Sequence, residues 1–335
     1  MTNSSAIESV RRLPSGVLPD ELDTFLLRAG GEWFRGFYRN DAAVEASHLK
    51  RRLTAQNIGG HVLLESRGVG GLQALAVLER MKWDSTHFGL EIYRVAPVLS
   101  DTSLPPEQQR DLLKALHRGV LDAAQASGAG LLLRRLRSSR LGEIRTLEEL
   151  GYRLADNVVT MTAKVPTAET NLPAGVTVRA LTVADVPLAQ ALMKGSFSLS
   201  RFCLEPILQA RGEAVYSQWL NNVFAVDAAP MGRVVECDGQ FAGFTMWTRD
   251  AAVSEEVGHA LALLDLFVVG AQWRGRGLGA ALLSDTLREM GRTGAQRVEA
   301  STWIGQSAAM ATYQKLGFAV RENLLSFHLE LEKTA

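Results

Sequence analysis

The second half of the chain shows the clearest pattern of apolar and polar positions. Period-two alternation or short apolar runs predict strands, and recurrence every three or four residues predicts helices. The predicted strands are residues 176–182, 233–239, 240–249, 260–269, 296–302 and 324–331. The predicted helices end near residue 194 and span 277–294 and 307–317. This order indicates a mixed α/β fold in which helices flank a largely antiparallel central sheet.

A polar segment with two prolines, residues 163–175, separates this half from an equally patterned first half. We therefore expect two domains, residues 1–165 and 175–335. The segment through Phe224 that follows the first helix is polar and aromatic, and its pattern assigns no element to it.

The two halves contain a gapless internal repeat. Leu150-Gly151-Tyr152 lies 166 positions before Leu316-Gly317-Phe318, and Gly128 and Asn157 match Gly294 and Asn323 at the same offset. Apolar positions agree throughout, so the halves are predicted to be two copies of one fold.

The copies differ at one loop. Residues 272–283, QWRGRGLGAALL, place three glycines and two arginines directly before a predicted helix. Such a loop lets the backbone approach a ligand, and the helix start offers unpaired N–H groups, which together favour an anion site. At the repeat offset the first half has Gln108 to Leu113, without glycine, and Leu147 stands where the second half has Tyr313. A turn needed only for folding should have been kept in both copies.

Composition limits the classes of partner. Thirty-six basic and thirty-six acidic residues cancel, so no overall charge attracts nucleic acid or an anionic membrane. The first sixteen residues lack an apolar core of signal-peptide length, and we expect a cytoplasmic protein. Two cysteines, Cys203 and Cys237, offer neither a disulfide framework nor a metal site.

The strand, the R-G-R-G-L-G loop (274–279) and the later A-x-x-x-Y-x-x-L-G-F motif (309–318) together resemble the acetyl-CoA site of the GNAT superfamily of N-acetyltransferases. The resemblance covers about residues 176–331 and implies tandem GNAT-like folds, with a degenerate first copy as scaffold and wall of the acceptor cleft. It implies acetyl-CoA as co-substrate and no metal. The implied cofactor-binding residues are Phe267, Val268, Val269, Arg274, Gly275, Arg276, Gly277, Leu278, Gly279, Ala280 and Gln306, the last standing where the family often has asparagine.

The same resemblance implies that Tyr313 is the general acid that protonates the departing thiolate. Its alternative is a core aromatic residue on an amphipathic helix. For the base that deprotonates the amine, Asp265 is the first candidate and Glu236 the next, and Asp265 could instead bind substrate.

Two further blocks, W-D-S-x-x-F-G at 83–89 and S-R-F at 200–202, resemble the bacterial two-domain acyltransferases typified by dTDP-fucosamine acetyltransferase. This narrower resemblance implies substrate contacts, with core aromatics, a helix cap at Asp84 or Ser85, or simple packing as the alternatives. The implied substrate-binding residues are Trp83, Asp84, Ser85, Phe88, Arg201, Tyr216 and Glu236.

We therefore expect an acetyl-CoA-dependent N-acetyltransferase that acts on a small-molecule amine, foremost a nucleotide-linked amino sugar. The alternatives are another amine (an amino acid, an aminoglycoside or a protein amine) or a non-catalytic acyl-CoA sensor. No nucleic acid or membrane partner is expected, and the chain is expected to be a monomer or homodimer.

Overall fold

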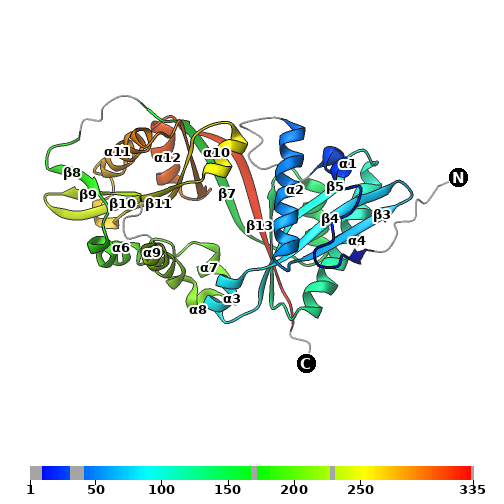
Figure 1. Cartoon of the computed structure of the whole chain (residues 1–335). Helices are drawn as coiled ribbons and strands as arrows, with labels where there is room; N and C mark the ends of the chain where they lie inside the picture. Colours follow the sequence, from blue (N-terminus) through cyan, green and yellow to red (C-terminus); the bar gives the residue numbers. More distant parts are fainter. Residues whose placement is uncertain (1–9, 31–40, 167–171, 227–230, 333–335) are drawn as a thin grey trace. The chain divides into compact units, whose positions relative to one another are not determined.

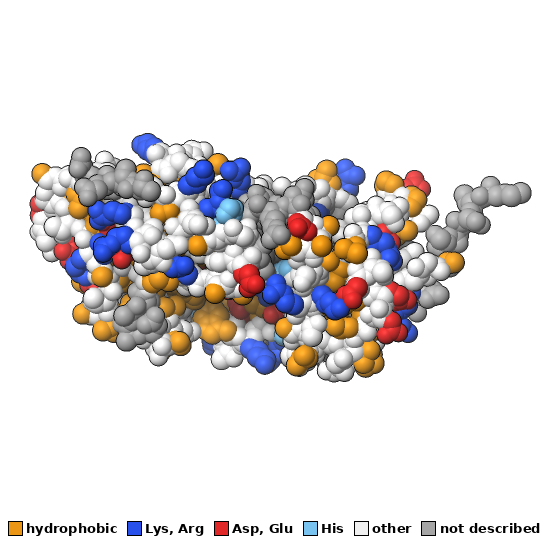
Figure 2. All heavy atoms as spheres, turned by 45° about the horizontal axis from the view of Figure 1, so that its top comes forward, with side chains coloured by type: hydrophobic (Ala, Val, Ile, Leu, Met, Phe, Trp, Pro, Cys, Tyr) orange, Lys and Arg blue, Asp and Glu red, His pale blue; other side chains and the backbone are white. Residues whose placement is uncertain are grey.

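The computed structural model describes residues 10–30, 41–166, 172–226 and 231–332, which fold as two compact units (Figure 1). Unit 1 comprises Met1–Asp156 together with Leu324–Ala335, and unit 2 comprises Asn157–Asn323. Among the described helices, none is both long and apolar enough to cross a membrane. Figure 2 shows basic and acidic side chains scattered over one face of the molecule, in keeping with the balanced charge.

Unit 1 contains one sheet in the order β1-β3-β4-β5-β6-β13, with β2 paired to β5. Only the β5–β6 pair is parallel in this described sheet. Its strands are β1 (Arg11–Arg12), β2 (Ala29–Gly30), β3 (Val62–Gly68), β4 (Gly71–Arg80), β5 (Ile92–Asp101), β6 (Leu131–Arg137) and the end of β13 (Ala319–Glu330). Its helices are α1 (Leu22–Arg28), α2 (Ala42–Ile58), α3 (Lys82–Phe88), α4 (Pro106–Ala126) and α5 (Leu141–Glu149).

Unit 2 repeats this plan with the order β8-β9-β10-β11-β12-β7, and β11–β12 is its parallel pair. The strands are β8 (Val176–Ala180), β9 (Gly232–Cys237), β10 (Gln240–Arg249), β11 (Leu261–Val269), β12 (Arg297–Trp303) and most of β7 (Arg153–Lys164). The helices are α6 (Val186–Met193), α7 (Arg201–Leu204), α8 (Gln209–Gly212), α9 (Ala214–Val226), α10 (Ala251–Val257), α11 (Leu278–Arg292) and α12 (Ser307–Lys315), with short 3₁₀ turns at Val183–Asp185 and Ala271–Trp273. The expected fold class, tandem mixed α/β units with mainly antiparallel sheets, is confirmed.

The unit boundary differs from the expected linker because each unit completes its sheet with a strand from the other half of the chain. In unit 1, residues 324–330 of β13 pair with β6. In unit 2, residues 158–164 of β7 pair with β12. The segments 157–165 and 324–332 therefore belong to the opposite units from those predicted, because strand pairing and not the proline-rich segment decides where they pack.

The repeat is confirmed at the level of elements. The bounds of β6, α5 and β7 each lie 166 positions before those of β12, α12 and β13. The copies diverge before the long helix: α4 begins at Pro106 and includes residues 108–111, whereas the matching residues 274–277 form a loop and α11 begins only at Leu278. The glycines of the second copy thus replace the first turns of a helix.

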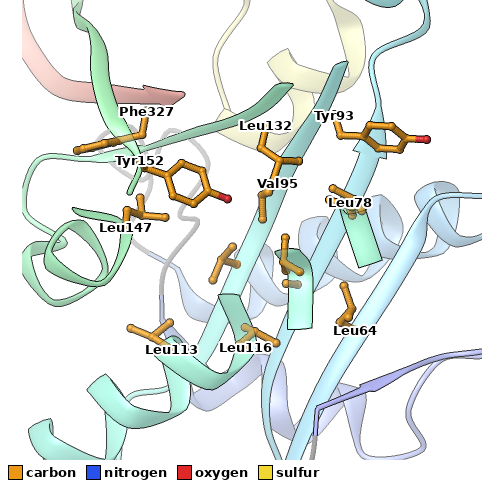
Figure 3. Close-up of a cluster of buried hydrophobic side chains, with 14 of the residues drawn as sticks. Leu64, Leu78, Tyr93, Val95, Leu113, Leu116, Leu132, Leu147, Tyr152 and Phe327 are labelled. Carbon is orange, nitrogen blue, oxygen red and sulfur yellow. The ribbon is translucent and has the colours of Figure 1, made fainter. Parts of the chain in front are cut away.

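Each unit has its own core. In unit 1, α4 and α5 pack on the sheet around Leu116, Leu147 and Tyr152, and Figure 3 shows Leu147 beside the Tyr152 ring. In unit 2 two clusters lie on opposite faces of the sheet. One joins Leu264 and Tyr313 to α11 and α12, and the other joins Leu266 and Val268 to α6 and α9.

Candidate functional site

Strands β11 and β12 part in the middle of unit 2. Their parallel pairing runs from Leu261 with Arg297 to Leu264 with Ala300 and stops there, although β11 continues to Val269 and β12 to Trp303. On its other edge β11 stays paired with β10 as far as Val269. In the described sheet, residues 265–269 therefore have one backbone edge without a strand partner, and an extended ligand could add to it as a strand does.

A β-bulge accompanies this divergence. The β10–β11 register shifts between Met246 and Trp247, whose partners are Leu266 and Leu264, and Asp265 is the extra residue. The shift explains why Leu264 and Leu266 enter cores on opposite faces of the sheet.

The glycine loop leads from the open edge to α11. Gly275 and Gly277 have φ of 76° and 78°, left-handed values that favour glycine, and a Cβ added to either would meet no atom within 4 Å. Gly277 is the N-cap of α11 and has no side chain to cap the helix, and the first turn contains no acidic residue. No described residue accepts a hydrogen bond from the N–H groups of residues 275–280. The open space and the unpaired donors fit a phosphate group.

Two arginines flank this cradle. Arg274 is exposed, and its Nε donates a 3.3 Å hydrogen bond to the Val269 carbonyl at the end of β11. The guanidinium of Arg276 lies 5.1 Å from the centre of the Trp273 ring. Both cations lie beside the helix start, where they add to its positive potential.

Tyr313 projects from α12 into the core of unit 2. It is 4% exposed, and its ring lies 5.8 Å from Phe267 of β11 and 5.1 Å from Phe318. Burial raises the pKa of the phenol, so the hydroxyl keeps its proton at neutral pH. No described side chain hydrogen-bonds this hydroxyl. Tyr313 is thus a core aromatic residue whose phenol keeps its proton, and its role as general acid stays a prediction.

Asp265 combines an exposed position with a perturbed carboxyl group. Loss of hydration raises its pKa to about 6, with a smaller opposing effect from a hydrogen bond with Thr248. Trp247 enters the core beneath α11 and α12, so its neighbour Thr248 faces the other side of the sheet. Contact with Thr248 places the Asp265 carboxylate on that side also, opposite the helix that holds Tyr313.

Glu236 and Gln306 occupy other surroundings. The Glu236 carboxylate on β9 accepts a 2.8 Å hydrogen bond from Arg179 Nε on the neighbouring strand β8. Strand β10 lies between β9 and β11, so Glu236 is two strands away from the open edge of β11. This pairing leaves Asp265 as the better-placed base candidate. Gln306 is the N-cap of α12, two helical turns before Tyr313 and on the same helical face.

The polar-aromatic segment, which the sequence left unassigned, folds as α7, α8 and α9. Tyr216 stacks on Phe197 at 3.9 Å, and Arg201 lies 4.5 Å above the Phe202 ring. Tyr216 and its neighbour Trp219 on α9 are partly buried against the α6–α9 core, which agrees with the packing alternative for Tyr216.

The W-D-S block forms α3 of unit 1. The N-cap of this helix is Met81, so the alternative in which Asp84 or Ser85 caps a helix is wrong. The buried Ser85 hydroxyl accepts a 3.0 Å hydrogen bond from the Ile92 N–H, which ties α3 to β5. Trp83 is 38% exposed and stacks on His87, and Phe88 lies edge-on to His87. Ser85 therefore has a structural role, whereas Trp83 is not a core residue.

Unit 1 has the same strand divergence but fills it with its own side chains. Parallel pairing of β5 with β6 ends at Arg94 with Leu133. Beyond that point, Arg134 and Arg140 donate 3.2 Å hydrogen bonds to the carbonyls of Val95 and Val98 on β5.

Glu143 neutralises these cations at 2.7 Å from each, and His117 Nε2 lies 3.2 Å from the same carboxylate. Burial alone would raise the pKa of Glu143, but Arg134 and Arg140 hold it well below its usual range. The buried Glu143 network thus occupies the backbone edge that is open in unit 2.

Sequence reasoning missed one acidic residue beside the gap, Glu299 of β12, which is 8% exposed. The alternation of β12 could have located it, because Val298 and Ala300 both enter the core with Tyr313.

Comparison with known proteins agrees with this geometry. Residues 197–318 match the acetyltransferase (GNAT) family. The mycothiol acetyltransferase of Corynebacterium glutamicum is 39% identical over 77 residues, which are 22% of this chain and 25% of that protein. The matched region thus spans about a quarter of the length of this curated relative.

Solved structures resemble the chain over most of its length. A GCN5-related N-acetyltransferase from Sphaerobacter thermophilus has a TM-score of 0.64 at 16% identity, covering 96% of this chain and 95% of its own. A tandem GNAT protein from the clavulanic acid biosynthesis pathway has a TM-score of 0.53 at 15% identity, covering 82% and 84%. These likenesses concern the fold. The segment that matches the acetyltransferase (GNAT) family contains the cradle and Tyr313, and the fold of the chain is similar to that of a tandem GNAT protein.

Proposed function

We propose that unit 2 transfers an acetyl group from acetyl-CoA to the primary amine of a small acceptor. The observation that carries the proposal is the open edge of β11 at residues 265–269, which leads directly into a cradle of unpaired N–H groups. A thioester with an extended amide arm and a pyrophosphate needs these two features in this order. The retained phenol of Tyr313 argues against a sensor that only binds acyl-CoA.

In this proposal the backbone of Phe267, Val268 and Val269 pairs with the pantetheine amides. The N–H groups from Gly275 to Ala280 hold the pyrophosphate, whereas the Arg274 N–H is already donated to the Ala271 carbonyl; the guanidinium groups of Arg274 and Arg276 contact the phosphates. Gln306 supplies an amide contact near the start of α12.

The chemistry requires a neutral amine, a polarised carbonyl and a protonated leaving group. The amine nitrogen gives a proton to Asp265 and forms a bond to the thioester carbon. A backbone N–H on the open edge of β11 near Val268 stabilises the developing oxyanion. The carbon–sulfur bond then breaks, and the thiolate takes a proton from Tyr313. Asp265, with a pKa of about 6, is ionised and can accept a proton at neutral pH.

A nucleotide-linked amino sugar is the acceptor that we favour, on the resemblance of the W-D-S and S-R-F blocks. The similarity to mycothiol acetyltransferase favours a second candidate, the deacetylated form of mycothiol.

The test is release of free thiol from acetyl-CoA by the full-length chain. The panel contains nucleotide amino sugars, glucosamine, deacetylated mycothiol, aminoglycosides and lysine peptides. Amine-dependent thiol release and acetylated product support the proposal. Acetyl-CoA binding without release by any amine would support the sensor instead.

A further inference from the structure

Helix α11 carries the cradle at its start and packs against β9, β10 and β11 of unit 2 (Figure 1). Two successive residues of this helix make polar contacts with neighbouring strands. The Asp285 carboxylate accepts a 2.7 Å hydrogen bond from Arg233 Nε of β9. The hydroxyls of Thr286 and of Thr245 on β10 lie 2.7 Å apart. Arg233 and Thr245 are paired in the sheet, so both contacts lie in one row across two strands.

Both contacts are buried, and their polar atoms are paired. Asp285 is 2% exposed, and Thr245 and Thr286 are fully buried. Each carboxylate oxygen of Asp285 accepts a hydrogen bond, one from Arg233 and one from Arg288 of the same helix. The Thr286 hydroxyl donates its proton to the helix backbone at 2.8 Å, which leaves Thr245 as the donor of the threonine pair.

Unit 1 makes the same contact between helix and sheet without polar side chains. At the repeat offset of 166 its helix α4 has Gly119 and Val120 in place of the aspartate and the threonine. On β3 and β4, Leu64 and Ala76 form the strand pair at the register of the arginine and the other threonine. A Cβ added to Gly119 would lie 3.7 Å from the Leu64 side chain, so these two positions meet as the ion pair of unit 2 does. The fold therefore does not need polar groups here, and of the two units only the one with the cradle has them.

Stability is a weak reason for such contacts. Removing two charges from water costs free energy, and replacing a buried ion pair with apolar residues is often neutral or stabilising. Directional contacts do supply a single arrangement. Contacts at two successive residues define both the position of α11 along the sheet and its rotation about its own axis, because a shift in either would leave a buried donor or acceptor unpaired.

The cradle depends on this placement. Its N–H groups can hold a pyrophosphate only while they lie at the end of the β11 edge that binds the extended arm of the same molecule. Asp285 lies about two helical turns beyond the start of α11 at Leu278. Resting on the proposed function, we propose that Asp285 and Thr286, with their partners on β9 and β10, are positioning residues that fix α11 relative to the open edge of β11, so that one acetyl-CoA molecule reaches both.

The test replaces each polar pair in the full-length chain. Thr245→Ala with Thr286→Val installs the residues that unit 1 has at these positions. Arg233→Leu with Asp285→Ala removes the ion pair without placing a glycine inside the helix. Both double variants should keep a Tm close to that of the wild type and should raise the Kd for acetyl-CoA about tenfold or more, because the site is no longer preorganised. Calorimetry well below the melting transition reports the folded fraction as the stoichiometry and the site as the Kd.

Two single variants are the controls. Thr286→Ser keeps a hydroxyl at the same place, and Glu289→Gln removes a carboxylate of α11 that pairs with the exposed Arg292. Both should bind acetyl-CoA as the wild type does. An unchanged Kd in the two double variants, whether or not Tm falls, would overturn the positioning role and leave the acetyltransferase proposal intact. A wild-type chain that binds no acetyl-CoA would refute the proposed function, and the positioning role with it.

Discussion

The ring of Phe267 lies 5.8 Å from that of Tyr313, and the same ring lies 3.3 Å from where a Cβ on Gly279 would stand. One side chain of β11 therefore contacts both the helix start that forms the cradle and the helix that holds the phenol. This contact fixes the distance between the proposed phosphate site and the proposed proton donor, because both helices pack on the same strand.

Replacing Tyr313 with phenylalanine should lower kcat about a hundredfold or more, since only the proton donor is lost. The ring and its contacts with Phe267 and Phe318 remain, so acetyl-CoA affinity and Tm should stay close to those of the wild type. Steady-state kinetics, calorimetry and thermal melts check these three expectations. Wild-type turnover with chemistry as the slow step would contradict the general-acid role.

Replacing Asp265 with asparagine should remove a limb of the pH–rate profile. If the carboxylate is the base, wild-type kcat/KM for the amine rises as pH passes through about 6, and the variant lacks this rise. Stability gives a second readout. The folded-state pKa lies above the unfolded value, so the wild type loses stability as pH rises from about 4 to about 6. Asp265→Asn should therefore melt higher than the wild type at pH 7.5, with a smaller difference near pH 4. Identical pH profiles would exclude Asp265 as the base.

The buried Glu143 network should show the asymmetry of buried ion pairs. Glu143→Gln leaves Arg134 and Arg140 without their counter-charge and should cost about 3–5 kcal/mol of unfolding free energy. Glu149→Gln, in the same helical segment, breaks an exposed pair with Lys114 and should cost about 1 kcal/mol or less. Chemical denaturation measures both. Equal, small decreases in unfolding free energy for the two variants would mean that the Glu143 network does not stabilise the place where β5 and β6 part.

The W-D-S block separates into structural and exposed positions. Ser85→Ala removes a buried hydroxyl bonded to the Ile92 backbone and should cost about 1–3 kcal/mol. Trp83→Ala should change Tm little, because more than a third of the residue is exposed. Lower turnover in folded Trp83→Ala protein would support the substrate contact expected from the sequence, and normal kinetics would count against it.

Much of this architecture could be predicted from the sequence, because the gapless repeat transfers each element between the halves. The bounds of the helix 307–315 and of the strand 297–303 are the same as those of their copies in the first half, shifted by 166 positions. The strand exchange could not be predicted, since the apolar pattern of 153–164 does not state which sheet it joins. The β-bulge was hidden too, because 260–269 reads as one apolar run in which Asp265 is a single interruption.

The site was predicted unevenly for a similar reason. The cradle is a local motif, and Gly275 and Gly277 have the left-handed φ values that favour glycine there. The buried Glu143 network of unit 1 depends on contacts between segments that are distant in the sequence. The position of Glu299 beside the open edge depends on such contacts too. The sequence shows that the first copy has no glycine at residues 108–113, and the structure adds that Arg134 and Arg140 occupy the edge that acetyl-CoA would need.

Titration calorimetry of acetyl-CoA into the full-length chain is the most direct test of the central claim, a single acetyl-CoA site formed by unit 2. The account predicts a stoichiometry near one. Gly277→Val should abolish the binding event, because its side chain enters the open space of the cradle. Gly239→Val is the matched control, since Gly239 also has a left-handed φ and open surroundings but lies in the β9–β10 hairpin. It should bind one equivalent. Two binding events per chain, or binding that survives in Gly277→Val, would contradict the account.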